Sequence, residues 1–66
     1  MQVRINGEQR EIPDGLTVAT LLGHLGVKAQ RVAVEVNESV VTRDKHGSHR
    51  LAAGDSIEIV AFVGGG

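Results

Sequence analysis

The sequence has no cysteine, tyrosine or tryptophan, and Phe62 is its one aromatic residue. Without cysteine, the chain offers neither a disulfide framework nor a zinc–thiolate site. One aromatic ring does not make a base-stacking platform, and a formal net charge of −1 gives no basic field that would attract nucleic acid or an anionic membrane. We therefore expect neither nucleic acid nor a membrane among its partners.

Long apolar runs are absent as well. No segment approaches the length of a membrane span, and no charged and then apolar leader opens the chain, which favours a cytoplasmic location. With 66 residues, nearly every aliphatic side chain is needed for one small core. Little material is left for an enclosed substrate pocket, so we do not expect a conventional enzyme.

The first residues predict a β-hairpin. Val3 and Ile5 alternate with polar residues, as in a half-buried strand. Asn6-Gly7 follows and favours a type I′ turn, in which both central residues have positive φ. The return strand, about 8–12, is mostly polar and is expected at a sheet edge, and Pro13-Asp14-Gly15 ends it.

One helix is predicted within residues 16–27. Thr17 suits its N-cap, and Gly26 suits a left-handed C-terminal cap. The apolar residues that fall on one helical face are Val18, Leu21, Leu22 and Leu25. Gly23 costs on the order of 1 kcal/mol relative to alanine in a helix, and we attribute it to close packing against the sheet or a neighbouring loop.

The second half of the chain predicts three more strands. Residues 32–36 alternate as a third strand, Asn37-Glu38 is a turn candidate, and residues 39–42 form a short return strand. A polar loop covers residues 43–49, after which Leu51 is expected to anchor the core.

The last strand is predicted at residues 56–62. Ile57 and Ile59 are assigned to its core face, so Val60 and Phe62 are expected to face outward. Apolar residues on an exposed face beside the end of a chain favour a docking patch for a partner. The alternative is that these are ordinary, singly exposed apolar side chains.

The order of these elements describes an α+β fold, the β-grasp (ubiquitin-like) roll. We expect a mixed four- to five-stranded sheet with one main helix packed on one face. A right-handed crossover is expected to put the third and last strands beside the first hairpin. Residues 1–63 are assigned to this domain and residues 64–66 to a flexible C-terminal glycine tail.

The glycine tail is the most specific chemical feature. Three terminal glycines arise by chance in only about a few per ten thousand chains, although a frayed end is the alternative interpretation. Glycine has no Cβ, so the tail can enter a narrow channel in a partner. The last strand runs straight into Val63 and the glycines, which favours delivery of the terminal carboxylate. Activation of that carboxylate, usually as an acyl-adenylate made with ATP, would need a partner enzyme.

The polar loop holds two histidines. The spacing of His46 and His49, with Asp44 nearby, is compatible with a metal site, but no further ligand is indicated and we favour a plain polar loop. The loop also carries basic residues, interpreted as solvated or, alternatively, as a contact for an acidic partner surface: Arg43, Lys45 and Arg50.

With these features the chain resembles the ThiS family, the sulfur carriers of thiamin (thiazole) biosynthesis. The matching segments are VAVEVN at 32–37 and AGDSIEIV at 53–60, which leads into FVGGG at 62–66. The terminal diglycine of the family falls on Gly65 and Gly66. The chain departs from the family pattern at two places. Family members often have Asn-Gly where this chain has Asn37-Glu38, and they commonly have an acidic capping-box residue where this chain has Thr20. The second departure puts the stability of the helix in question.

The resemblance implies a reaction cycle carried by Gly66. An E1-like adenylyltransferase uses ATP to activate the Gly66 carboxylate. Sulfur from cysteine, usually supplied through a cysteine desulfurase, then converts the activated carboxylate to a thiocarboxylate. Thiazole synthase finally takes that sulfur. The chain would bind no cofactor and act as a protein co-substrate. The residues expected to contact its partners are Val60, Phe62, Val63, Gly64 and Gly65.

Other functions remain open on the sequence. The small subunit of molybdopterin synthase uses the same terminal chemistry, but such chains are usually longer. Another ubiquitin-like sulfur carrier, or a protein tag, is a further alternative. From a different class, the chain could be a binding-only ubiquitin-like module whose glycines are inert.

Overall fold

The computed structural model describes residues 1–62. The elements in this part of the chain are the strands β1 (Gln2–Ile5), β2 (Glu8–Glu11), β3 (Val32–Val36), β4 (Ser39–Val41) and β5 (Ser56–Ala61), the helix α1 (Val18–Leu25), and short 3₁₀ turns at Ala29–Arg31 and Arg43–Lys45. The predicted order of strands and helix is confirmed, with strand ends within about one residue of those expected.

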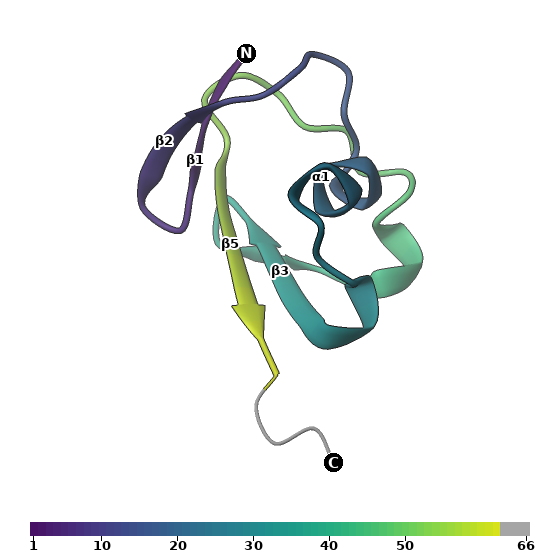
Figure 1. The fold of residues 1–66 in the computed structure, drawn as a ribbon. Coiled ribbons are helices and arrows are strands. Elements are labelled where there is room, and N and C mark those ends of the chain that lie inside the picture. The colour runs from purple at the N-terminus through teal and green to yellow at the C-terminus, as the bar shows by residue number, and fades with distance from the viewer. Residues whose placement is uncertain (63–66) are drawn as a thin grey trace.

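The five strands form one mixed sheet in the order β2-β1-β5-β3-β4. β5 runs parallel to β1 and antiparallel to β3, while both hairpins are antiparallel. The last strand therefore lies in the middle of the sheet, between the two hairpins (Figure 1). The expectation that the third strand also lies beside the first hairpin is wrong, because β5 fills that place and separates β3 from β1.

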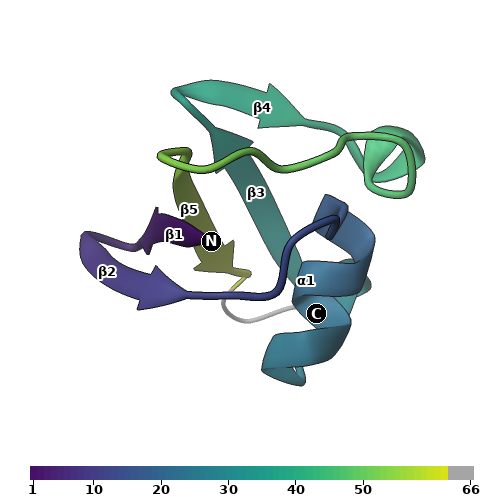
Figure 2. The ribbon, with the colours of Figure 1, turned by 90° about the horizontal axis from the view of Figure 1, so that it is seen from above.

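The helix crosses the inner face of the sheet and closes the core (Figure 2). Alternate residues of the strands point toward it, as the period of two requires. The buried apolar residues are Val3, Ile5, Ile12, Val18, Leu21, Leu22, Val32, Val34, Val36, Val41, Leu51 and Ile57. Leu51 is thus the core anchor that the sequence predicts.

Both ends of α1 are capped by the residues expected. Thr17 is the N-cap, and the Thr20 N–H donates to its hydroxyl at 3.2 Å. The Thr20 hydroxyl in turn accepts the Thr17 N–H at 2.7 Å, so a threonine completes the capping box without an acidic residue. The departure at Thr20 therefore leaves both capping hydrogen bonds in place. At the other end Gly26 has φ 74°, and the Val27 N–H donates to the Leu22 carbonyl at 2.9 Å.

Gly23 does not have the role assigned to it. A Cβ built at this position would meet no atom within 4 Å outside its own helix, so close packing does not require glycine there. The residue lies on the exposed side of α1, and nothing in the structure explains its identity.

The loop at residues 43–49 is more than a polar connection. The side chain of His46 is buried, with 5% exposed, and its Nε2 lies 3.1 Å from the Val41 carbonyl oxygen. The carbonyls of His46 and His49 accept the N–H groups of Ala19 (2.9 Å) and Val18 (3.0 Å). The loop therefore satisfies N–H groups that the first turn of α1 leaves without an intrahelical partner.

Candidate functional site

The candidate site is built on β5, the strand that ends at Ala61. It pairs with β3 from Val32–Ala61 to Val36–Ile57. The Phe62 N–H continues this ladder one step further by donating to the Arg31 carbonyl at 2.8 Å. The chain is thus held by backbone hydrogen bonds up to the last described residue. Val63, Gly64, Gly65 and Gly66 lie outside the described residues.

Two asparagine side chains also bind β5, one from each hairpin turn. The Ile59 N–H donates to Asn6 Oδ1 at 2.7 Å, and Asn6 Nδ2 donates to the Ile59 carbonyl at 3.2 Å. The Ser56 N–H donates to Asn37 Oδ1 at 3.0 Å. Both asparagines have positive φ, 50° and 53°, as the turn signals predict. Their contacts to β5 were not predicted, because a turn signal says nothing about the strand on which the side chain will rest.

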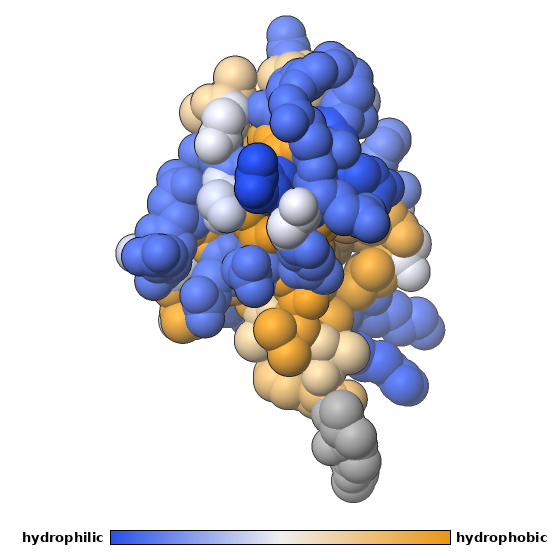
Figure 3. Space-filling model, turned by 90° about the vertical axis from the view of Figure 1, so that its left-hand side faces the viewer, coloured by the Kyte–Doolittle hydropathy of each residue, from blue (hydrophilic) through white to orange (hydrophobic). Residues whose placement is uncertain are grey.

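Val60 and Phe62 face outward, as the alternation on the last strand predicts. Their side chains are 59% and 57% exposed, and Val40 of β4 is 66% exposed. Ala33 lies opposite Val60 on β3 and is also exposed. We call these four residues the tail-root patch. Figure 3 shows apolar side chains gathered at the end of this face where β5 finishes.

Val40 and Ala33 are the members of the patch that sequence reasoning missed. The signal was present, since Val41 is buried and its neighbour must then point to the other face. A hollow of about 190 Å³ lies at this end of the sheet, and Ala33, Val40 and Phe62 are among the residues that line it. Ala33, Val40 and Phe62 thus meet at one hollow, although they come from different segments of the sheet.

Two carboxylates lie next to the patch on the same face. Glu35 and Glu58 are directly opposite each other on β3 and β5, and both are exposed. Like charges in this cross-strand position are destabilising. In residues 1–62, neither of them takes part in an ion pair.

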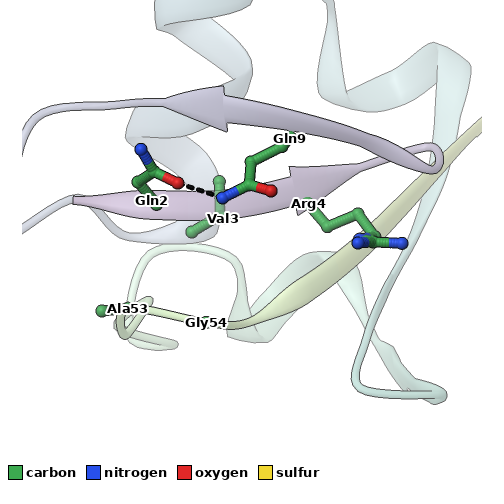
Figure 4. A pocket seen from close by; sticks show the side chains of 6 residues that line it. All are labelled: Gln2, Val3, Arg4, Gln9, Ala53 and Gly54. Carbon is green, nitrogen blue, oxygen red and sulfur yellow. Dashed lines mark hydrogen bonds between the residues drawn. The ribbon is translucent and has the colours of Figure 1, made fainter.

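The opposite end of the outer face is polar. A hollow of about 290 Å³ is lined there by residues of β1, β2 and the turn before β5. Figure 4 shows Gln9 hydrogen-bonded to Gln2, with the Arg4 guanidinium on the other side of Gln9. The apolar character of the outer face is thus concentrated at the end where the chain continues toward its glycines.

The ammonium group of Met1 provides the ion pairs of residues 1–62. It lies 3.0 Å from Asp14 Oδ1 and 3.1 Å from Glu11 Oε2, and it donates to the Ile12 carbonyl at 2.6 Å. The hydrogen bond to Asp14, and then the one to Glu11, raise the pKa of this ammonium above its ordinary value of 8.0. These contacts fasten the start of β1 to the end of β2.

The histidines of the loop at residues 43–49 differ in their surroundings from the expected plain polar loop. No group of three or more potential ligands was found among residues 1–62. The Thr42 hydroxyl donates to Asp44 Oδ1 at 2.6 Å, and His46 is part of the packed interior. The burial of His46 was missed, because an irregular loop has no period from which burial can be read.

Among residues 1–62, none of the helices has the length and apolar content that a membrane span requires.

Comparison with known proteins assigns the chain to a family. The model of the ThiS family matches residues 3–66. This chain belongs to the ThiS family. The fold agrees, because the crystal structure of a thiamine biosynthesis protein (ThiS) from Geobacter metallireducens superimposes with a TM-score of 0.87 at 33% identity, covering 100% of both chains. The β-grasp fold predicted from the element order is confirmed.

ThiS-family sequences occur both as separate small proteins and as part of longer proteins. The sulfur carrier protein ThiS of Thermus thermophilus is 36% identical over 97% of this chain and 98% of its own length. A thiazole synthase of Paramagnetospirillum magneticum is 46% identical over 100% of this chain. The chain spans only 20% of that thiazole synthase, so most of the relative has no counterpart here.

Proposed function

We propose that this chain is a sulfur carrier of thiamin (thiazole) biosynthesis and that the carboxylate of Gly66 carries the sulfur. The observation that carries the proposal is the match to a ThiS crystal structure over the whole of both chains. The central position of β5 supports it as well, since this strand leads from the most strongly paired part of the sheet toward Gly66.

The proposed chemistry takes place in partner enzymes. The Gly66 carboxylate attacks the α-phosphate of ATP in an E1-like adenylyltransferase, which releases pyrophosphate and forms an acyl-adenylate. The persulfide sulfur of a cysteine desulfurase displaces AMP, and reduction of the resulting acyl disulfide by a thiol leaves the thiocarboxylate. Thiazole synthase then takes this sulfur into the thiazole ring. The chain itself binds no cofactor and acts as a protein co-substrate in the cytoplasm.

Thiazole synthase as a partner has separate support. In the Paramagnetospirillum relative, a segment similar to this whole chain is part of one polypeptide named thiazole synthase. Sequences that are joined in one protein are often partners when they are separate. We therefore propose that this chain docks on a separate thiazole synthase.

The tail-root patch is the proposed docking surface for these enzymes. Its three large apolar side chains, Val40, Val60 and Phe62, are more than half exposed. They lie beside the end of β5, so a partner that covers them is also placed to receive Val63, Gly64 and Gly65 in its channel. Exposed apolar surface of this kind marks interaction sites.

Intact mass spectrometry tests the proposal. The chain is incubated with an E1-like adenylyltransferase, ATP, a cysteine desulfurase, cysteine and a thiol. We expect a gain in mass equal to the replacement of one oxygen by sulfur, and no gain for a variant that lacks Gly66. An unchanged mass with an activating enzyme that modifies another ThiS protein would favour the binding-only module.

A further inference from the structure

Asn6 stands where the pairing between β1 and β5 comes to an end. The two strands are in parallel register at Arg4–Ser56 and Ile5–Ile57, and the Asn6 N–H then donates to the Ile57 carbonyl at 2.9 Å. Here the chain turns back into β2. The next backbone groups of β5 that point toward β1, those of Ile59, therefore have no strand residue opposite them.

The side chain of Asn6 replaces the missing strand residue. Its Oδ1 accepts the Ile59 N–H at 2.7 Å, and its Nδ2 donates to the Ile59 carbonyl at 3.2 Å. A carboxamide offers the same donor and acceptor as a peptide group. The β1 side of β5 is thereby hydrogen-bonded two residues further toward the end of the strand than the backbone of β1 reaches.

Asparagine meets two requirements at this position. The residue has φ 50°, a region that glycine, asparagine and aspartate enter most readily. Of these three, asparagine alone has a side chain that both donates and accepts. Turn geometry alone would be met equally well by glycine, so the turn does not explain the amide.

Asn37 has the same place in the other hairpin but binds the opposite end of β5. It has φ 53°, its Oδ1 accepts the Ser56 N–H at 3.0 Å, and its Nδ2 donates to Asp55 Oδ1 at 3.0 Å. Asn37 thus fixes the beginning of β5, and Asn6 fixes its later part. The pair provides an internal control for the role of either one.

We propose that Asn6 is a positioning residue for the reaction of Gly66. By holding Ile59, it fixes the later part of β5 from both sides, and this fixed base favours delivery of the terminal carboxylate into the partner's active site. Without its amide, the later part of β5 is held from the β3 side alone. This inference rests on the proposed function.

The consequence is specific to the chemical step. Asn6 is not part of the tail-root patch, and pairing with β3 still holds Val60 and Phe62 when the Asn6 amide is lost, so the docking surface stays in place. A carboxylate that is poorly aimed within a formed complex reacts more slowly, because reaction rates depend steeply on the placement of the reacting atoms. The turnover number should therefore fall, while the Michaelis constant for the carrier changes little.

The test compares Asn6→Gly with Asn37→Gly. Glycine accepts positive φ without strain, so each variant keeps its turn and loses only one amide. Two quantities are measured: hydrogen exchange at the Ile59 amide, and kcat and KM for adenylation of the chain, followed by pyrophosphate release. Asn6→Asp is a third variant, because it keeps an acceptor for the Ile59 N–H and loses the donor.

In Asn6→Gly we expect the Ile59 amide to exchange about tenfold faster and kcat to fall about tenfold, with KM within about twofold. Asn37→Gly should leave the exchange rate, kcat and KM near those of the unmodified chain. The exchange rate and kcat of Asn6→Asp should lie between those of Asn6→Gly and the unmodified chain. Unchanged exchange at Ile59, or equal loss of kcat in both glycine variants, would overturn the positioning role. If the unmodified chain is not adenylated at all, the proposed function fails, whereas the exchange comparison still decides whether Asn6 holds β5.

Discussion

The two faces of the sheet use similar side chains for different purposes. On the inner face, Ile57 and Val34 are almost completely buried under α1, whereas Val60 and Val40 on the outer face are more than half exposed. Because successive side chains of a strand point to opposite faces, one apolar segment supplies residues to both the inner and the outer face. The difference teaches that apolar content alone does not tell a core residue from a contact residue; the face on which the residue lies decides.

The inner face should dominate stability. Ile57→Ala removes a fully buried side chain, and large-to-small changes of this kind lower the free energy of unfolding by about 2–5 kcal/mol. That loss is a large part of the stability of a small domain. Urea denaturation measures it, with Val60→Ala as the outer-face control, expected within about 0.5 kcal/mol of the unmodified chain. Equal losses in the two variants would contradict the division between the faces.

The outer face should dominate binding. Phe62→Asp places a charge on the proposed docking surface, and we expect affinity for the adenylyltransferase or thiazole synthase to fall at least about tenfold, as for a large apolar contact residue. Thermal unfolding should barely change, because Phe62 is 57% exposed. Isothermal titration with each enzyme measures the affinity. Unchanged binding would show that the partners dock elsewhere.

A smaller effect is expected from the carboxylates of the outer face. Glu58→Gln removes the repulsion between Glu35 and Glu58 and should raise the free energy of unfolding by about 0.2–1 kcal/mol. The gain should shrink in high salt, since exposed charges are screened. Glu8→Gln on β2, directly opposite Ile5, is a control in which little change is expected. A loss of stability in Glu58→Gln would mean that Glu58 has a favourable partner.

The smallest expected effect concerns the amino group of Met1. Because its pKa is raised above 8.0 by Asp14 and Glu11, its contribution to stability is fully present below pH 8 and is lost as the pH rises through the raised value. Urea denaturation between about pH 7 and pH 10 should show this decline. Chemical acetylation of the amino group should remove the part of the decline in stability that this group causes. An identical decline in the acetylated and unacetylated chains would show that other groups cause it.

The sequence was sufficient for the fold because short-range signals agreed with one another. Asn6-Gly7, Thr17 and Gly26 mark turns and caps whose geometry is local, and Ile57 and Val60 follow strict alternation. The central position of β5 was not predicted, because strand order depends on pairing between distant residues. His46 was missed for a related reason: its burial is set by α1 and β4 together.

The candidate site was predicted less completely than the fold. Val60 and Phe62 were found because they lie on a long, regular strand, whereas Val40 belongs to a strand of three residues for which no face was assigned. The contacts of Asn6 with Ile59 span 53 positions in the sequence, and no local pattern indicates them. The roles of Gly64, Gly65 and Gly66 stay predictions, because these residues lie outside the described part of the chain.

The most direct test of the central claim follows the sulfur atom itself. The chain is loaded at Gly66 with isotopically labelled sulfur, purified, and incubated with thiazole synthase and its other substrates. The sulfur-carrier account predicts that the label appears in the thiazole product and that the chain returns to its original mass. A thiazole product without label, formed while the labelled chain stays loaded, would contradict the account.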